Sequence, residues 1–88
     1  MKSVLIVEDL PEIRQWLGDM ARAAFPDIEV SAAARLSEAL DGVRQGVFDL
    51  ALIDLGLPDG SGIDVVRALR RLQPKALPVV VTIYDDDD

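Results

Sequence analysis

The chain has 88 residues, of which half are hydrophobic, so it can form one small domain near the lower limit of independent stability. It contains no cysteine and no histidine, which excludes disulfides, thiolate or imidazole metal ligands, and Ser-His or Cys-His catalysis. Any chemistry must therefore rest on carboxylates, hydroxyls or a group supplied by another molecule. The net charge of −7 argues against nucleic-acid binding by this segment and favours cations or basic partners.

The first expected element is a buried strand from Val4 to Val7, a continuous apolar run that stops at two acids. This run is too short for a signal-peptide core or a membrane span, which predicts a cytoplasmic protein that does not contact the membrane. An amphipathic helix is expected from Pro11 to about Ala24, because apolar residues recur there at three- and four-residue spacing. Pro11 is typical of a first helical position, and Pro26 marks the stop.

The rest of the chain continues the alternation of strands and helices. In chain order, the expected elements are a short strand from Ile28 to Val30 that continues into the following serine and alanines, a helix from Leu36 to Val43, a strand from Leu50 to Ile53, a glycine- and proline-rich loop from Leu55 to Gly62, a helix from Ile63 to Leu72 and a strand from Val79 to Ile83. This order predicts a doubly wound α/β fold, with a parallel sheet and helices on both faces.

Acidic and hydroxyl side chains stand at the ends of three expected strands. Glu8 and Asp9 follow the first strand, Asp54 follows the third, and Thr82 lies near the end of the fourth. Each of them alone is typical of a solvated strand end, a helix cap or an ordinary strand position. Because the carboxyl ends of parallel strands share one edge, where ligands of such sheets bind, the joint pattern predicts a site.

Three carboxylates gathered at one edge repel one another unless a cation neutralises them. Mg²⁺ is the simplest candidate, since it prefers hard oxygen ligands and keeps several waters. A carboxylate beside such an ion can attack phosphorus and form an aspartyl phosphate. Asp54 is central and precedes a flexible loop, so it is the candidate nucleophile.

Three motifs match the pattern of one known family: Val7-Glu8-Asp9, then Asp54-Leu55-Gly56-Leu57-Pro58 with Gly62, then Val80-Val81-Thr82. They resemble the receiver domain of two-component response regulators, the CheY-like superfamily, and the resemblance covers the whole chain. The Asp-x-x-Leu-Pro-x-x-x-Gly stretch is its most specific part. The resemblance implies a flavodoxin-like parallel sheet with strand order 2-1-3-4-5.

The resemblance also implies residue roles and partners. Asp54 would accept the phosphoryl group from a sensor histidine kinase, while Asp9, Asp54 and the Gly56 backbone carbonyl would bind Mg²⁺, which Glu8 would reach through water. Thr82 would be the switch hydroxyl that hydrogen-bonds the phosphoryl group. The domain would catalyse only its own phosphoryl transfer and dephosphorylation. The run that begins at Thr82 resembles LuxR/NarL-type regulators, so transcription would be controlled through an output domain that binds DNA outside this segment.

The chain departs from the family pattern in length. Family members have five strand-helix units, whereas the fourth helix, the fifth strand and the fifth helix are absent here, so residues 1–88 are interpreted as a partial receiver domain. The family lysine at the end of the fifth strand is also absent, and Lys2 and Lys75 precede strands at the opposite end of the sheet. The range from Val79 to Ile83 would then form an exposed apolar edge, which predicts self-association by strand pairing or swapping.

Two other interpretations remain open. The first is a degenerate or truncated receiver that acts as a non-phosphorylated protein-interaction module; the absent lysine favours it and the intact acids oppose it. The second is a magnesium-dependent enzyme of the toprim type, which also gathers acids at strand ends. Such an enzyme would require an Asp-x-Asp pair after its later strand, but Gly56 occupies the position of the second acid.

Overall fold

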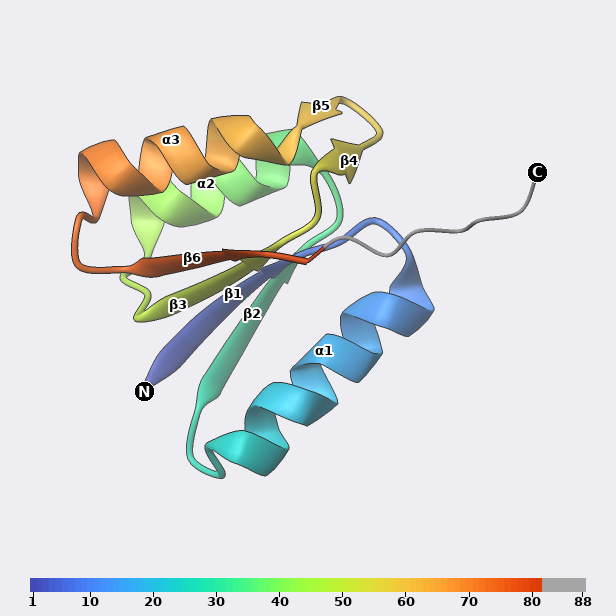
Figure 1. Cartoon of the computed structure of the whole chain (residues 1–88), viewed down its shortest axis with the longest axis vertical. Coiled ribbons are helices and arrows are strands. Elements are labelled where there is room, and N and C mark those ends of the chain that lie inside the picture. Colours follow the sequence, from blue (N-terminus) through green and yellow to red (C-terminus); the bar gives the residue numbers. More distant parts are fainter. Residues whose placement is uncertain (82–88) are drawn as a thin grey trace.

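The computed structural model describes residues 1–81, which form a four-stranded parallel sheet (Figure 1). Its strands are β1 (Ser3–Val7), β2 (Glu29–Ala33), β3 (Leu50–Ile53) and β6 (Leu77–Val80), in the spatial order β2-β1-β3-β6. The central strand β1 is buried on both faces, which explains its continuous apolar run. The doubly wound parallel sheet predicted from the sequence is confirmed.

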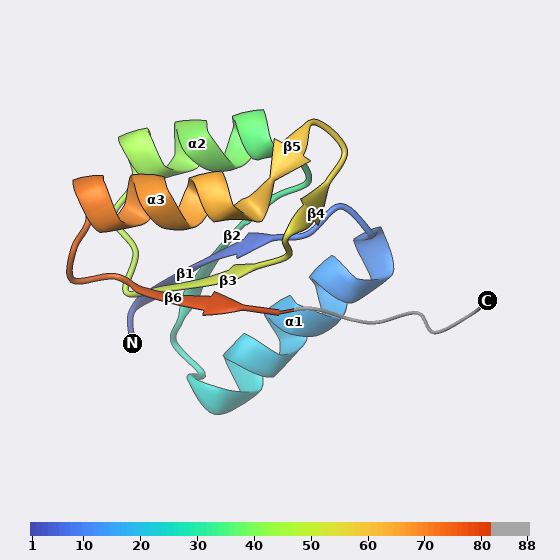
Figure 2. The same cartoon turned by 45° about the horizontal axis from the view of Figure 1, so that its top comes forward.

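Three helices cover the two faces of the sheet (Figures 1 and 2). α1 (Pro11–Ala24) lies on one face, and α2 (Leu36–Gln45) and α3 (Gly62–Leu72) lie side by side on the other. α1 has a proline in its first turn and ends at Ala24, with Phe25 as the C-cap residue, as the sequence predicts. None of the helices within residues 1–81 is long and apolar enough to cross a lipid bilayer.

The sheet separates two apolar cores. The smaller core, under α1, consists of Val4, Ile6, Leu17, Ala21 and Ile28. The larger core, under α2 and α3, consists of Leu5, Val7, Ala33, Ala39, Val43, Phe48, Ala51, Ile53, Leu57, Val65, Leu69 and Ala76. Successive residues of β1 alternate between the two cores, as the period of a strand requires. The sheet is thereby fixed in register, which fixes where each strand ends.

The fourth strand of the sheet differs from its prediction. β6 begins at Leu77, two residues before the predicted range of 79–83, and ends at Val80. Thr82 and Ile83 lie outside the residues that the structure describes. The sequence pattern missed the start because Pro78 follows Leu77, and proline is a poor strand residue by local criteria.

The sheet tolerates Pro78 because of its position on the strand. The N–H groups of Leu77 and Val81 donate to the carbonyl oxygens of Asp49 and Ile53, both at 2.9 Å. Only alternate residues of β6 direct their N–H groups toward β3, so the nitrogen of Pro78 faces the open edge. Proline therefore removes no hydrogen bond from the β3–β6 pair.

The loop after Asp54 is more regular than predicted. Within it, β4 (Gly56–Leu57) pairs antiparallel with β5 (Gly60–Ser61), and α3 begins at Gly62 rather than at Ile63. The side chain of Ser61 caps α3 by accepting a hydrogen bond from the N–H of Ile63 at 3.2 Å. This small hairpin leads the chain from the end of β3 across to the helical layer.

The outer side of β6 exposes apolar side chains. Leu77, Val79 and Val80 are 52%, 37% and 45% exposed, and within the described part of the chain no strand pairs with this edge. Trp16 and Met20 of α1 are also exposed. The exposed apolar edge expected at positions 79 and 80 is confirmed.

Candidate functional site

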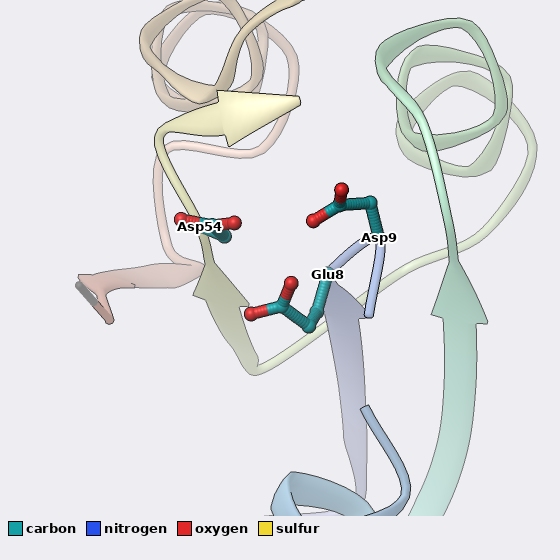
Figure 3. A group of neighbouring side chains, drawn as sticks. All are labelled: Glu8, Asp9 and Asp54. Atoms are coloured by element: carbon teal, nitrogen blue, oxygen red, sulfur yellow. The ribbon is translucent and has the colours of Figure 1, made fainter. Parts of the chain in front are cut away.

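Three carboxylates meet at the carboxyl ends of two neighbouring strands. Glu8 and Asp9 directly follow β1, and Asp54 directly follows β3, which pairs in parallel with β1. Figure 3 shows the three side chains facing a common space beyond these strand ends. One ligand oxygen from each of them lies within 4.8 Å of the other two. The structure thus brings together three of the residues that the sequence singled out, while Thr82 lies outside the described residues.

Glu8 is the most buried of the three acids, with 3% of its surface exposed. The pKa of Glu8 is raised to about 7, above all by burial; the N–H of Leu10, which donates to Oε2 at 3.1 Å, opposes this rise, and Asp9 and Asp54 contribute to it. A proton on Glu8 is one way to relieve the crowded negative charge. A cation among the three oxygens is the other way, since it favours the ionised carboxylates.

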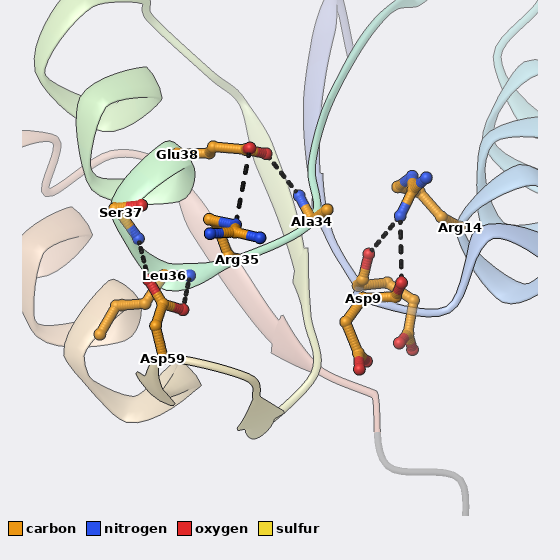
Figure 4. Close-up of polar contacts among 9 residues, drawn as sticks. Asp9, Arg14, Ala34, Arg35, Leu36, Ser37, Glu38 and Asp59 are labelled. Atoms are coloured by element: carbon orange, nitrogen blue, oxygen red, sulfur yellow. Dashed lines mark hydrogen bonds and ion pairs between the residues drawn. The ribbon is translucent and has the colours of Figure 1, made fainter.

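Hydrogen bonds to backbone carbonyl oxygens hold the two segments that carry the acids in place. The N–H of Asp54 donates to the carbonyl oxygen of Val7 at 2.8 Å, which ties the end of β3 to the end of β1. The guanidinium of Arg14 donates to the carbonyl oxygens of Glu8 at 2.9 Å and Asp9 at 3.4 Å (Figure 4). Sequence reasoning missed Arg14; the available signal was a basic residue one turn into the helix that follows the acid pair.

The chain after Asp54 packs closely against the site. The N–H of Gly56 donates to Oδ1 of Asp54 at 3.3 Å, and the N–H of Gly62 donates to the carbonyl oxygen of Leu55 at 2.9 Å. A Cβ atom at Gly62 would overlap the carbonyl oxygen of Asp54. The last glycine of the family-like motif is therefore required for α3 to begin beside the acidic cluster.

Asp59 anchors the same loop to α2. Its carboxylate accepts hydrogen bonds from the N–H groups of Leu36 at 2.6 Å and Ser37 at 3.0 Å (Figure 4), whereas the side chain of Arg35 at the N-cap position makes no capping bond. The N–H of Ser37 above all holds the pKa of Asp59 below its usual range. Sequence reasoning missed this contact because its partners are 23 and 22 residues apart.

The donor set fits a magnesium ion. All three side chains offer hard carboxylate oxygens, and within residues 1–81 there is no cysteine or histidine to favour a softer metal. Glu8 lies buried beside Asp9 and Asp54, and a divalent cation would neutralise the negative charge of the three ionised carboxylates. The three carboxylates at this site are therefore chemically suited to the magnesium ion that the sequence implied.

Known proteins match the chain in both sequence and fold. The sequence profile of the family described as response regulator receiver domain matches residues 4–88. The KDP operon transcriptional regulatory protein KdpE of Escherichia coli is 42% identical over 83 residues, which cover 92% of this chain and 34% of KdpE.

Two solved structures extend the comparison. The response regulator TrrA of Thermotoga maritima, in complex with Mg²⁺-BeF, is 30% identical with a TM-score of 0.85, and the match covers 97% of this chain and 72% of TrrA. A chain of the complex between histidine kinase ThkA and TrrA is 29% identical with a TM-score of 0.80, and the match covers all of this chain and 76% of that one.

The matches cover nearly all of this chain but only part of the length of its relatives. The chain spans between 19% and 41% of the length of the first three curated relatives that it matches. The family profile, by contrast, covers all but the first three residues of this chain. This chain therefore belongs to the family of receiver domains of two-component response regulators.

Proposed function

We propose that this chain accepts a phosphoryl group on Asp54 from the phosphohistidine of a sensor histidine kinase. The observation that carries the proposal is the convergence of Asp54 with Glu8 and Asp9 within 4.8 Å at the ends of β1 and β3. Two solved structures of one relative support it, since TrrA binds Mg²⁺-BeF in one and forms a complex with the histidine kinase ThkA in the other.

In the proposed reaction, an oxygen of Asp54 attacks phosphorus while the phosphorus–nitrogen bond of phosphohistidine breaks, so that the imidazole leaves. The N–H of Gly56 orients the attacking carboxylate through its bond to Oδ1. Asp9, Asp54 and the Gly56 carbonyl would hold Mg²⁺ directly, and Glu8 through water. When bound, the ion neutralises charge on the transferring oxygens. The chain would turn over no external substrate beyond its own phosphorylation and dephosphorylation.

The phosphoryl group would then act as a signal. In this proposal the hydroxyl of Thr82 hydrogen-bonds the phosphoryl group and shifts a two-state surface, which changes the affinity for a partner. KdpE is named as a transcriptional regulatory protein, which supports transcription as the output of the full-length protein. DNA would be bound by a segment outside this chain, because the net charge here is −7.

Intact mass spectrometry after incubation with acetyl phosphate tests the phosphorylation. A phosphoryl adduct should form with Mg²⁺, map to Asp54 and disappear in Asp54→Asn. Asp64→Asn is the matched control, because Asp64 is an exposed acid on α3 outside the acidic cluster. Asp9→Ala should weaken Mg²⁺ binding in calorimetry. An adduct that persists in Asp54→Asn, or that forms equally well without Mg²⁺, would contradict the proposal.

We also propose self-association through the open edge of β6, which would make the chain an interaction module even without phosphorylation. The supporting observation is the exposure of Leu77, Val79 and Val80 along an edge that no described strand covers. Sedimentation of the chain should reveal a concentration-dependent dimer that Val80→Lys weakens. Met20→Lys is the control, because Met20 is 44% exposed on α1, whose main contacts in the sheet are with β1 and β2. A monomer at every concentration would refute this association.

A further inference from the structure

A groove runs between α2 and α3 and continues past the end of α3 to the segments that precede β3 and β6. Its first part encloses about 310 Å³, and the two parts that follow enclose about 300 and 400 Å³. All three parts share Leu72, and neighbouring parts share Arg44 or Val47, so they form one continuous surface. This surface is called the α2–α3 groove below.

The α2–α3 groove is basic although the chain is acidic. Four cationic side chains line it: Arg44, Arg67, Arg71 and Lys75. Two of these cations are already paired, Arg44 with Asp41 at 3.2 Å and Arg67 with Asp64 at 3.6 Å, and the carboxylate of Asp49 accepts two backbone N–H groups. Arg71 and Lys75 form no ion pair with any residue between 1 and 81. On a chain of net charge −7, the groove thus offers two cations that are not already paired within the described residues.

The same groove exposes apolar side chains. Val47 is 83% exposed and Leu72 is 47% exposed, and both line the part of the groove beyond the end of α3. Neither residue belongs to the two cores of the fold. Their burial by a ligand would therefore add hydrophobic stabilisation at no cost to the folded chain. An apolar strip with cationic neighbours is the chemistry that recognises an acidic, amphipathic segment.

We propose that the α2–α3 groove binds an acidic, amphipathic peptide segment of a partner protein. Carboxylates of the segment would pair with the guanidinium group of Arg71 and the ammonium group of Lys75 through charge-assisted hydrogen bonds. Aliphatic side chains of the segment would cover Val47 and Leu72. A nucleic acid fits less well, because it has no aliphatic side chains to cover the exposed Val47 and Leu72.

The groove is separate from the acidic site. Glu8 and Asp54 lie at the carboxyl ends of the strands, whereas Val47 and Lys75 precede β3 and β6 at the opposite end of the parallel sheet. Figure 2 shows α2 and α3 side by side, with the turn from α3 to β6 at the end far from β4 and β5. The two unpaired cations and the apolar strip of the groove take no part in the chemistry at Asp54, so failure of one proposal leaves the other standing.

Fluorescence anisotropy with a labelled helical peptide of repeated Glu-Glu-Leu-Leu units tests the proposal on the full chain. Arg71→Glu should weaken binding about tenfold or more, because a charge pair becomes a charge repulsion. Val47→Ser should weaken binding by a smaller factor, and its exposure should leave the fold intact in circular dichroism. Arg70→Glu is the matched control, since Arg70 is an exposed neighbour of Arg71 that does not line the groove.

The expected result is saturable binding that falls with rising salt and is lost in the same peptide with Gln in place of Glu. The proposal is overturned by the absence of saturable binding, by equal binding of the Gln peptide, or by an equal effect of Arg70→Glu. Single-stranded DNA and vesicles with phosphatidylserine are tested in parallel. If either binds more tightly than the peptide and is released by Arg71→Glu, the partner is not an acidic peptide.

Discussion

The buried carboxyl group of Glu8 should make the free energy of unfolding depend on pH. The pKa of Glu8 in the folded chain is about 7, against 4.5 ordinarily, so the folded state binds this proton more tightly than the unfolded state. As pH rises from 4.5 to 7, the unfolded state loses the proton first. The free energy of unfolding then falls by about 1.4 kcal/mol per pH unit, or about 3 kcal/mol in all, and levels off above pH 7.

Magnesium should reverse this loss. The ion competes with the proton on Glu8, so its apparent affinity should rise as pH approaches 7 and up to one proton should leave for each ion bound. A ligand at ten times its dissociation constant stabilises the folded state by about 1.4 kcal/mol. Magnesium should therefore stabilise the chain more above pH 7 than below it.

Urea denaturation followed by circular dichroism between about pH 5 and pH 8, with and without MgCl₂, measures both effects. Glu8→Gln should remove most of the pH slope and should be more stable than the unaltered chain at pH 8 without the ion. Glu12→Gln, at an exposed position of α1, is the control and should keep the slope. A slope that is the same in Glu8→Gln and in the unaltered chain would refute the reasoning.

Three further predictions concern the contacts that position the site and the helical layer. Gly62→Ala should cost about 1 to 3 kcal/mol of stability and weaken Mg²⁺ binding, because its Cβ displaces the Asp54 carbonyl; Gly56→Ala, with open space around it, should cost less in the same urea and calorimetric measurements. Asp59→Ala should speed hydrogen exchange of the first two amides of α2, and unchanged exchange would contradict the capping role. In the unaltered chain the protection of these amides should be lost as pH falls below about 3.8, because the pKa of Asp59 is lowered and its carboxylate is ionised above that pH. Gln73→Ala should cost about 2 to 4 kcal/mol in urea denaturation, because three main-chain groups lose their partner, and a loss below 1 kcal/mol would show that water replaces it.

The acidic cluster could be predicted because each of its parts follows from local sequence and one topological rule. The apolar run of β1 ends at Glu8, and that of β3 ends at Asp54, so both strand ends are visible in the sequence. Parallel pairing of β1 with β3 places these ends at one edge of the sheet. Thr82 follows the same reasoning for β6, and its role stays a prediction because it lies outside the described residues.

Other contacts could not be predicted because they join residues that are far apart in the sequence and meet only after the helices and strands have packed. Asp59 bonds to α2 only because the β4–β5 hairpin lies over the first turn of that helix. Gln73 bonds to the N–H of Phe48 across 25 residues, which no local pattern indicates. Pro78 argues against a strand by its own propensity, and only the pairing with β3 shows that its nitrogen needs no partner.

Hydrogen bonds hold the layer of α2 and α3 at both of its ends, and they connect the acidic site to the groove. At the site end, Asp59 ties the loop after Asp54 to α2. At the opposite end, the side-chain amide of Gln73 donates to the carbonyl oxygens of Val43 and Gly46 at 2.8 and 2.7 Å. A displacement of the loop after Asp54 must therefore either break the bonds of Asp59 or move α2, which lines the groove. If phosphorylation and peptide binding are coupled through these bonds, each must change the affinity for the other by the same factor. Replacement of Asp59 should then reduce this coupling, whereas the peptide should still bind to the groove.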